Sequence, residues 1–196
     1  MLGFIKPGMT EKQVRNELEN FMFANGADSL AFGSIVASGP NTANPHAVPS
    51  DRVIEKGDFV LMDYGAGYCD YRSDMTRTVV MGESPRRSSS TCTRSMRRAH
   101  EVRRRHPSGV EATTFSNFQE DHWRCRLWRL HTMVWARRGV DIHELPKLQP
   151  QQEYHRGRLG YHHEPGVHLP GVRGGVRLED TAWSPRTATT LHQTPA

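Results

Sequence analysis

Apolar positions recur with helical spacing near the start of the chain. Over residues 11–24 they fall three or four positions apart and would line one face of a helix (Val14, Leu18, Phe21 and Met22). Thr10 precedes this stretch and is a residue type that caps helix N-termini. Asn25 and Gly26 follow it and are typical of a helix end. The pattern predicts an amphipathic helix over 11–24.

Short apolar runs between turn signals predict strands. They cover residues 32–37, 59–65 and 73–80, and turn-forming clusters lie at 38–41 and 55–58. The last two runs are joined by a short connection that contains glycine. They therefore predict an antiparallel hairpin.

The rest of the chain is less regular. Residues 85–138 follow neither a helical nor a strand period. Residues 140–146 and 164–181 have the composition of strands and turns, whereas residues 154–163 and 183–190 do not. We expect residues 85–138 to be irregular and exposed, because this stretch lacks the apolar face that buries a helix.

Length and composition limit the class of protein. A chain of 196 residues with 36% hydrophobic residues can form one domain with one core. Because it has no apolar run of about 18 residues and no apolar leader, we expect neither a membrane span nor a secretory signal. Its three cysteines (Cys69, Cys92 and Cys125) form no Cys-x-x-Cys pair. We therefore expect a cytoplasmic protein without a disulfide framework.

Positive charge is concentrated in one block. The net charge is +5, and residues 85–138 carry thirteen Arg, no Lys and four acidic residues. Such a block, with its tryptophans, is compatible with an arm that binds nucleic acid. An arginine-rich stretch without lysine is also what GC-rich DNA encodes when it is read out of frame. We favour this second explanation and expect no nucleic-acid partner.

Two aspartates near the predicted hairpin are the first candidates for chemistry. Asp63 and Asp74 are eleven residues apart, an offset that can bring both side chains to one face of two antiparallel strands. Neighbouring carboxylates repel each other unless a cation lies between them, and oxygen ligands suit Mn, Co, Fe or Zn. The alternative is that Asp63 simply ends a strand and that Asp74 forms a surface ion pair with Arg77.

The segments around these aspartates resemble a known family. Met-Asp-Tyr-Gly-Ala at 62–66 and Ser-Asp-Met-Thr-Arg-Thr at 73–78 resemble the paired-aspartate signature of the pita-bread metallopeptidases, which include prolidase, Xaa-Pro aminopeptidase and methionine aminopeptidase. Four further segments resemble the family's histidine and glutamate motifs in the same order: Asn-Pro-His-Ala-Val-Pro at 44–49, Asp-Ile-His-Glu-Leu-Pro at 141–146, Glu-Pro-Gly at 164–166 and Gly-Gly-Val-Arg-Leu-Glu-Asp at 174–180. The second aspartate motif and the Glu-Pro-Gly turn favour the Xaa-Pro branch.

The resemblance implies an α+β fold, the pita-bread (creatinase/aminopeptidase-like) fold, in which helices flank a curved antiparallel sheet. It covers residues 1–84 almost continuously and then shorter segments within 139–181. We expect a single metallopeptidase catalytic domain over 1–196, incomplete because 85–138 lacks the family's pattern. The N-terminal domain that Xaa-Pro members usually carry is expected to be absent.

The resemblance also implies a site with two divalent metal ions. Manganese is the ion we expect, with cobalt, zinc or iron as alternatives. The implied metal ligands are Asp63, Asp74, Glu164 and Glu179. Asp74 and Glu179 would bridge the two ions, Asp63 would hold one ion and Glu164 the other. We expect Arg177 to orient Glu179.

The reaction that the resemblance implies is metal-dependent hydrolysis of a peptide bond next to proline, by a dipeptidase or an aminopeptidase. His46 and His143 would bind the peptide substrate and stabilise the oxyanion. Glu164 would pass a proton to the leaving amine. We expect no membrane partner, and a homodimer is possible.

One metal ligand of the family is missing. Its histidine lies in a Gly-His-Gly-x-Gly turn, seven residues before the position of His143, and that position holds Ala136. Codons for Trp-Ala-Arg-Arg at 135–138 can encode Gly-His-Gly-Val when read one base out of phase. Three other stretches hide family-like residues in the same way, and all four tryptophans lie in such patches (Trp123, Trp128, Trp135 and Trp183). We infer a family member whose reading frame shifts several times and whose activity is impaired as written.

Two other interpretations stay open. The missing histidine permits a catalytically inactive pita-bread binding module. A cysteine nucleophile is less favoured, because no histidine is matched to Cys69.

Overall fold

The computed structural model describes residues 3–83, 174–177 and 179 with their side chains, and the backbone of six further strands. The elements of the N-terminal part are α1 (Glu11–Ala24), β1 (Ser29–Leu30), β2 (Ile35–Ser38), the 3-10 helix η1 (Gly39–Ala43), β3 (Phe59–Tyr64), β4 (Ala66–Tyr68), β5 (Tyr71–Arg72) and β6 (Met75–Val80). The later strands are β7 (Leu130–His131), β8 (Trp135–Arg138), β9 (Leu159–His163), β10 (Gly166–Leu169), β11 (Gly174–Arg177), β12 (Asp180–Ser184) and β13 (Thr190–Leu191). Within the described residues, no helix has the length and hydrophobicity needed to cross a membrane.

Helix α1 has the bounds that the sequence predicts. A capping box closes its N-terminus, in which Gln13 N donates to Thr10 Oγ1 (3.2 Å) and Thr10 N donates to Gln13 Oε1 (2.9 Å). After the helix, Gly26 adopts a φ of 94°, a left-handed value that favours glycine. Val14 and Leu18 are buried, which confirms the apolar stripe at these two positions, whereas the stripe is wrong at Phe21, which is 56% exposed.

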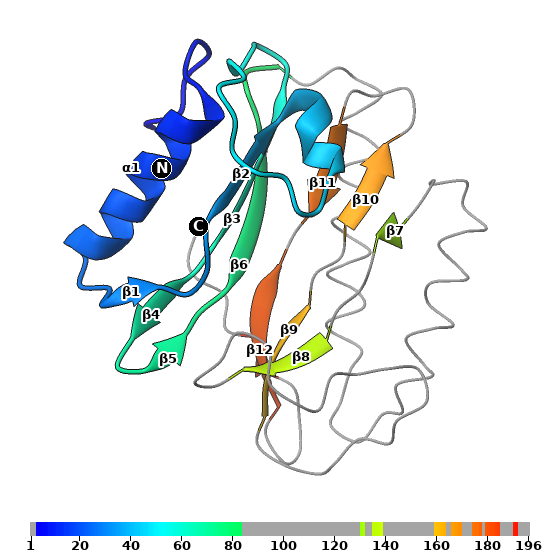
Figure 1. The fold of residues 1–196 in the computed structure, drawn as a ribbon. Coiled ribbons are helices and arrows are strands. Elements are labelled where there is room, and N and C mark those ends of the chain that lie inside the picture. The colour runs from blue at the N-terminus through cyan, green and yellow to red at the C-terminus, as the bar shows by residue number, and fades with distance from the viewer. Residues whose placement is uncertain are drawn as a thin grey trace.

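A three-stranded antiparallel sheet, in the order β2-β3-β6, separates α1 from β11 (Figure 1). On one face, apolar side chains pack together with those of α1 into the core (Ile5, Val14, Val36, Ile54, Val60, Met62 and Met81). On the other face, β11 contacts both β3 and β6. Because both faces are covered, β3 is buried at every position except Tyr64. The candidate site lies on the face that β11 covers.

The strand predicted over 32–37 is wrong at its start, since β2 begins only at Ile35. Just before it, Arg72 Nη1 donates hydrogen bonds to the carbonyl oxygens of Leu30 (3.1 Å) and Ala31 (2.9 Å). In addition, Leu30 lies opposite Ala66 of β4, and Ala31 N donates to Gly65 O (2.8 Å), so the chain at this point pairs toward β4 and not with β3. The ladder with β3 therefore starts later than local composition suggests.

The predicted hairpin of 59–65 with 73–80 is confirmed as the antiparallel pair β3–β6, but its connection is not a simple turn. Strands β4 and β5 form a second hairpin, which pairs with β1 in a separate sheet. At its tip, Cys69 and Asp70 adopt φ values of 48° and 65°. Cys69 N donates to Asp28 Oδ2 (2.8 Å), and the Cys69 thiol is free and exposed.

Strands also form where the sequence predicts irregular structure. β8 pairs with β9, β9 pairs with β12, and β7 pairs with β10. The expected irregularity is therefore wrong for β7 and β8 within 85–138, for β9 within 154–163, and for the start of 183–190, where β12 continues. Neighbouring strands supply the backbone partners of these segments, so tertiary context overrides local propensity. The predicted strands and turns at 140–146 lie outside the described residues.

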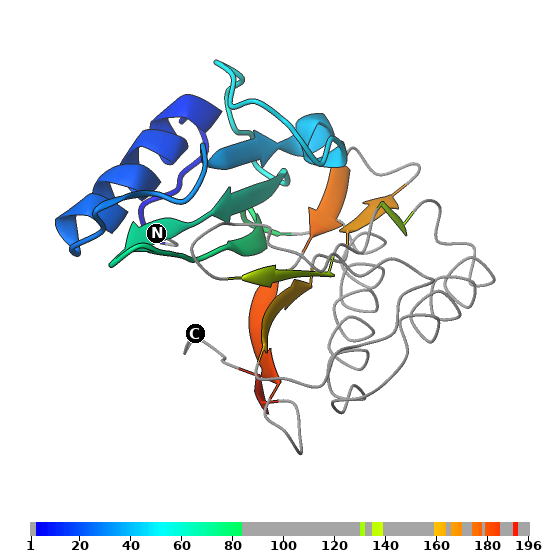
Figure 2. The ribbon, with the colours of Figure 1, turned by 60° about the horizontal axis from the view of Figure 1, so that its bottom comes forward.

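Strand β11 joins the C-terminal part of the chain to the N-terminal part. Thr42 in η1 accepts a hydrogen bond at Oγ1 from Gly175 N (2.6 Å). Thr78 Oγ1 donates to Arg177 O (2.8 Å) and accepts from Arg177 N (3.1 Å). Figure 2 shows β11 directly beside η1. These contacts fix β11 at both of its ends and so determine where Arg177 lies.

Candidate metal centre

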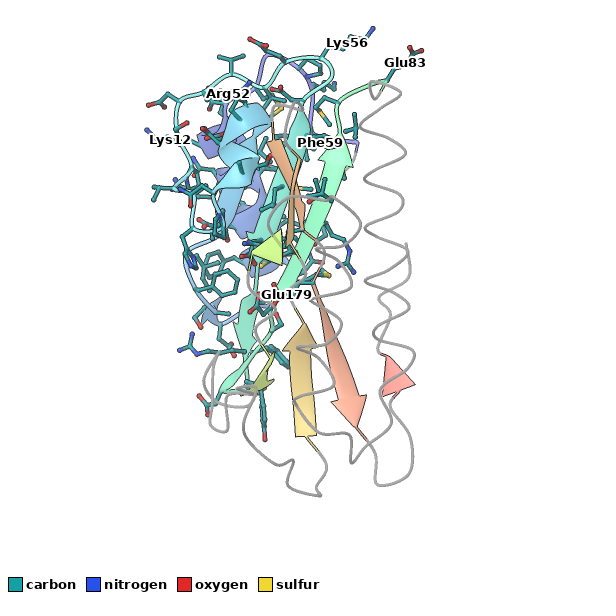
Figure 3. All side chains as sticks on the ribbon, turned by 90° about the vertical axis from the view of Figure 1, so that its right-hand side faces the viewer. Lys12, Arg52, Lys56, Phe59, Glu83 and Glu179 are labelled. Atoms are coloured by element: carbon teal, nitrogen blue, oxygen red, sulfur yellow. The ribbon has the colours of Figure 1, made fainter. Side chains whose placement is uncertain are left out.

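Three buried carboxylates meet on the face of the sheet that β11 covers. Asp63 lies near the end of β3, Asp74 directly precedes β6, and Glu179 lies between β11 and β12. One carboxylate oxygen from each residue lies within 4.8 Å of those from the other two. The three residues are only 7%, 6% and 1% exposed, so water screens their charges poorly. Figure 3 shows Glu179 beside the β3–β6 pair, at the end away from Phe59 and Glu83.

The register of the β3–β6 pair explains why the two aspartates are close. Asp63 lies opposite Thr76. Side chains alternate along a strand, so Asp74, two positions before Thr76, points to the same face as Thr76 and is the diagonal neighbour of Asp63. At 6% exposed, Asp74 is not the surface residue that the alternative interpretation requires.

Thr76 and Arg77 hold Glu179 against the start of β6. Thr76 Oγ1 donates to Glu179 Oε2 (2.9 Å), and Glu179 N donates to Thr76 O (3.1 Å). Arg77 Nη1 donates to Glu179 O (2.7 Å). Sequence reasoning quoted Thr76 within a motif and gave it no role. Its position two residues after Asp74, on the same strand face, is the signal that could have found it.

Arg177 binds three different parts of the site. Its Nη2 forms an ion pair with Asp63 Oδ2 (2.5 Å), its Nε donates to Thr76 Oγ1 (3.2 Å), and its Nη1 donates to Pro45 O (2.9 Å). The residue is 4% exposed. The sequence suggested that Arg177 orients Glu179. In the structure it holds Asp63 directly and is linked to Glu179 through the Thr76 hydroxyl.

The carboxylate cluster suits a divalent cation. Three acidic side chains share a buried space in which Arg177 supplies a single positive charge. Like charges at this separation disfavour one another strongly when they are buried, and a cation between them removes the repulsion. Carboxylate oxygens are hard ligands, which suit Mg²⁺, Ca²⁺ and Mn²⁺ and also serve Zn²⁺ and Fe. In the part of the chain that the structure describes, this is the one group of three acids, His or Cys close enough to hold a metal ion.

His46 lies on an exposed loop that is tied to the cluster. The His46 backbone N–H donates to Asn44 Oδ1 (3.0 Å), which closes a local turn. At the residue before His46, Pro45 O accepts a hydrogen bond from Arg177 Nη1, and Arg177 also binds Asp63. The loop and the carboxylates therefore share one anchoring side chain.

Two site residues that the sequence predicts, Glu164 and His143, lie outside the described residues. The backbone of Ala136 belongs to β8 and lies opposite His162 on β9, and β9 pairs in turn with β12. Position 136 is thus part of the sheet whose strand β12 begins directly after Glu179.

Residues 1–183 match the sequence profile of Metallopeptidase family M24. The chain is 34% identical over 181 residues to the Xaa-Pro dipeptidase of Pyrococcus furiosus, and the match covers 90% of this chain and 51% of that protein. The chain thus spans about half the length of the curated relatives it matches.

Solved structures agree with this assignment. The Xaa-Pro dipeptidase from Bacillus anthracis superposes with a TM-score of 0.89 at 33% identity, over 99% of this chain and 56% of that one. The X-Pro aminopeptidase from Thermotoga maritima gives 0.88 at 28% identity, over 98% and 55% of the two chains. The α+β pita-bread fold and the resemblance to the Xaa-Pro branch are confirmed. The chain belongs to metallopeptidase family M24.

Proposed function

We propose that this protein is a metal-dependent peptidase that hydrolyses bonds next to proline, as an Xaa-Pro dipeptidase or aminopeptidase. The observation that carries the proposal is the buried cluster of Asp63, Asp74 and Glu179. The relatives named Xaa-Pro dipeptidase and X-Pro aminopeptidase support a peptide substrate with proline. We place this activity in one catalytic domain and assign the protein to the cytoplasm. We assign it no nucleic-acid partner and leave homodimer formation as an option.

We assign two divalent ions to the site, manganese first, with cobalt, zinc or iron as alternatives. Asp74 and Glu179 would serve as ligands of both ions, Asp63 of one and Glu164 of the other. Ions bound there would supply a Lewis acid for the scissile carbonyl and an activated water molecule. The protein's part is to keep the carboxylates oriented, which Arg177 does for Asp63 through its ion pair.

The remaining assigned residues act on the substrate. His46, on the loop that Arg177 anchors, would bind the peptide. His143 would join it in stabilising the oxyanion, because hydrogen-bond donors aimed at developing negative charge lower the barrier. Glu164 would deliver a proton to the amine that leaves.

We expect the chain as written to be a poor catalyst. Ala136 occupies the position of the family's histidine ligand, and its methyl side chain offers no lone pair. Losing a ligand should cost at least the roughly 10–100-fold that losing an outer partner of a ligand costs. We attribute the missing histidine to shifts of the reading frame in the gene. Verified DNA that encodes 135–138 in frame, with no nearby insertion or deletion, would contradict this origin.

The experiment is an Xaa-Pro dipeptide assay with added Mn²⁺ or Co²⁺. It compares the chain as written, the Ala136→His variant, and a corrected chain in which the out-of-phase patches are restored. We expect metal-dependent turnover that increases in this order. No turnover by the corrected chain would refute the proposed activity, and equal turnover by all three would refute the role of position 136. Metal binding by a corrected chain without hydrolysis would instead favour an inactive binding module.

A further inference from the structure

Glu11, the first residue of α1, is a buried acid outside the carboxylate cluster. It is 0% exposed. Its Oε1 accepts hydrogen bonds from Ser38 N (2.7 Å), Ser38 Oγ (2.9 Å) and Asn41 Nδ2 (3.1 Å). Its Oε2 accepts from Ser50 N (2.9 Å) and Ser50 Oγ (2.6 Å). Five donors therefore converge on a single side chain.

These donors come from the two ends of one connection. Ser38 and Asn41 lie where β2 passes into η1, whereas Ser50 follows the loop that carries His46. The Glu11 carboxylate thus joins the start and the end of the segment 38–50, which contains no strand of its own after η1.

The same segment touches the candidate site at two points. Thr42 Oγ1 accepts from Gly175 N (2.6 Å), which holds β11, and Pro45 O accepts from Arg177 Nη1 (2.9 Å). Arg177 also binds Asp63. A displacement of the segment would therefore move the loop of His46 relative to the carboxylates.

The role of Glu11 depends on its being a carboxylate. Burial by itself raises the pKa of Glu11, but hydrogen bonds from Ser50, Asn41 and Ser38 outweigh it, and the pKa lies below its usual value. The side chain is therefore ionised and accepts all five bonds. An amide in its place would turn an NH₂ group toward a backbone N–H, so that two donors would face each other.

We propose that Glu11 is a positioning residue for the loop of His46, because it fixes the segment 38–50 and thereby holds this loop in register with Arg177 and Asp63. The consequence for substrate rests on the proposed function, because only a substrate-binding His46 makes the loop's position matter for hydrolysis. The role of Glu11 in placing the loop does not depend on the proposed function.

The test is hydrogen exchange on Glu11→Gln, with Glu17→Gln as the matched control on the same helix. We expect amides of 39–50 to exchange about tenfold faster or more in Glu11→Gln, the effect of losing hydrogen bonds to a charged group, while β3 and β6 exchange as in the parent. The control should leave both regions unchanged. Equal acceleration throughout the described strands, or none over 39–50, would overturn the proposal.

Activity supplies a second readout in the corrected chain. The cluster residues Asp63 and Asp74 stand on the β3–β6 pair, so Glu11→Gln should lower kcat/KM about tenfold for an Xaa-Pro dipeptide while Mn²⁺ affinity changes little. An unchanged kcat/KM well below the unfolding temperature would overturn the proposal. If the corrected parent hydrolyses no such peptide, the proposed function fails alone, and the exchange result decides the role of Glu11.

Discussion

At the scale of single residues, Arg177 links the carboxylate cluster to the loop that carries His46. It contacts Asp63, Thr76 and the carbonyl of Pro45 through three different nitrogen atoms. A guanidinium provides such donors in one rigid plane, which a lysine ammonium cannot do. Its contribution is therefore one of geometry as well as charge.

The variant Arg177→Lys separates these two contributions, because it keeps the charge and removes the planar donors. We expect Mn²⁺ affinity to fall by about 10–100-fold, as is typical when a residue that orients a metal ligand is changed. Isothermal titration calorimetry measures this directly. Arg72→Lys is the control, since the bonds from Arg72 to Leu30 O and Ala31 O lie outside the cluster. Equal affinity in both variants would show that the geometry of Arg177 is unimportant.

The repulsion within the cluster gives a second prediction. Without metal, Asp74→Asn should raise the melting temperature, because one of three buried like charges is removed. With Mn²⁺ at 100 times its Kd, the parent should gain about 2.7 kcal/mol, and Asp74→Asn should gain much less. Thermal unfolding with and without Mn²⁺ measures both effects. Asp51→Asn, at an exposed ion pair with Lys12, should behave as the parent does. A full Mn²⁺ gain in Asp74→Asn would exclude Asp74 as a ligand.

At the scale of elements, β11 depends on the absence of side chains at its start. A Cβ on Gly175 would lie 2.7 Å from Thr42 O, a distance that real contacts do not reach. We expect Gly175→Ala to push β11 from η1 and to lower the free energy of unfolding by about 1–3 kcal/mol, the usual cost of overpacking. Urea unfolding tests this against Gly33→Ala, where a Cβ would meet nothing within 4 Å. Equal effects of the two variants would mean that η1 and β11 are not closely packed.

The anchoring of α1 should depend on pH through Glu11. Its pKa in the folded protein lies below the usual 4.5, because hydrogen bonds to the carboxylate outweigh burial. A lowered pKa contributes stability that is fully present above the unfolded pKa and is lost as pH falls through the folded pKa. The free energy of unfolding of the parent minus that of Glu11→Gln should therefore be constant above pH 4.5 and should decrease below it. Urea unfolding across this range measures the difference, and a constant value in acid would contradict the pKa direction.

How far the sequence predicted each element depends on how local its causes are. Helix α1 was predicted with its bounds, because Thr10, which caps it, directly precedes the helix and the buried Val14 and Leu18 lie within it. The start of β2 was missed, because the partners of the Ala31 backbone, Gly65 and Arg72, are far away in the chain. β8 and β9 were missed because neighbouring strands, and not their own composition, give them their structure.

The same distinction holds within the candidate site. The spacing of Asp63 and Asp74 predicts their proximity, since one hairpin register controls it. Glu179 was predicted only from its motif, because its contact with Thr76 spans about half the chain. Glu11 was missed because an acid in the first turn of a helix is common without any further role. Only the fold reveals the five donors around it.

At the scale of the whole molecule, two parts of the chain build one centre. Strand β11 lies beside the sheet of β2, β3 and β6 (Figure 1). Asp63 lies on β3 and Asp74 directly before β6, whereas Arg177 lies on β11 and Glu179 just after it. The N-terminal part has its own apolar core with α1. The central claim is that these two parts meet around a divalent metal.

Anomalous X-ray diffraction from crystals of the chain grown with Mn²⁺ tests this claim most directly. We predict a manganese peak within coordinating distance, roughly 2–2.6 Å, of carboxylate oxygens from Asp63, Asp74 and Glu179. The peak should be absent in crystals of Asp74→Asn grown in the same way. A Mn²⁺-soaked structure without a peak among these three carboxylates, or with manganese bound only elsewhere, would contradict the account.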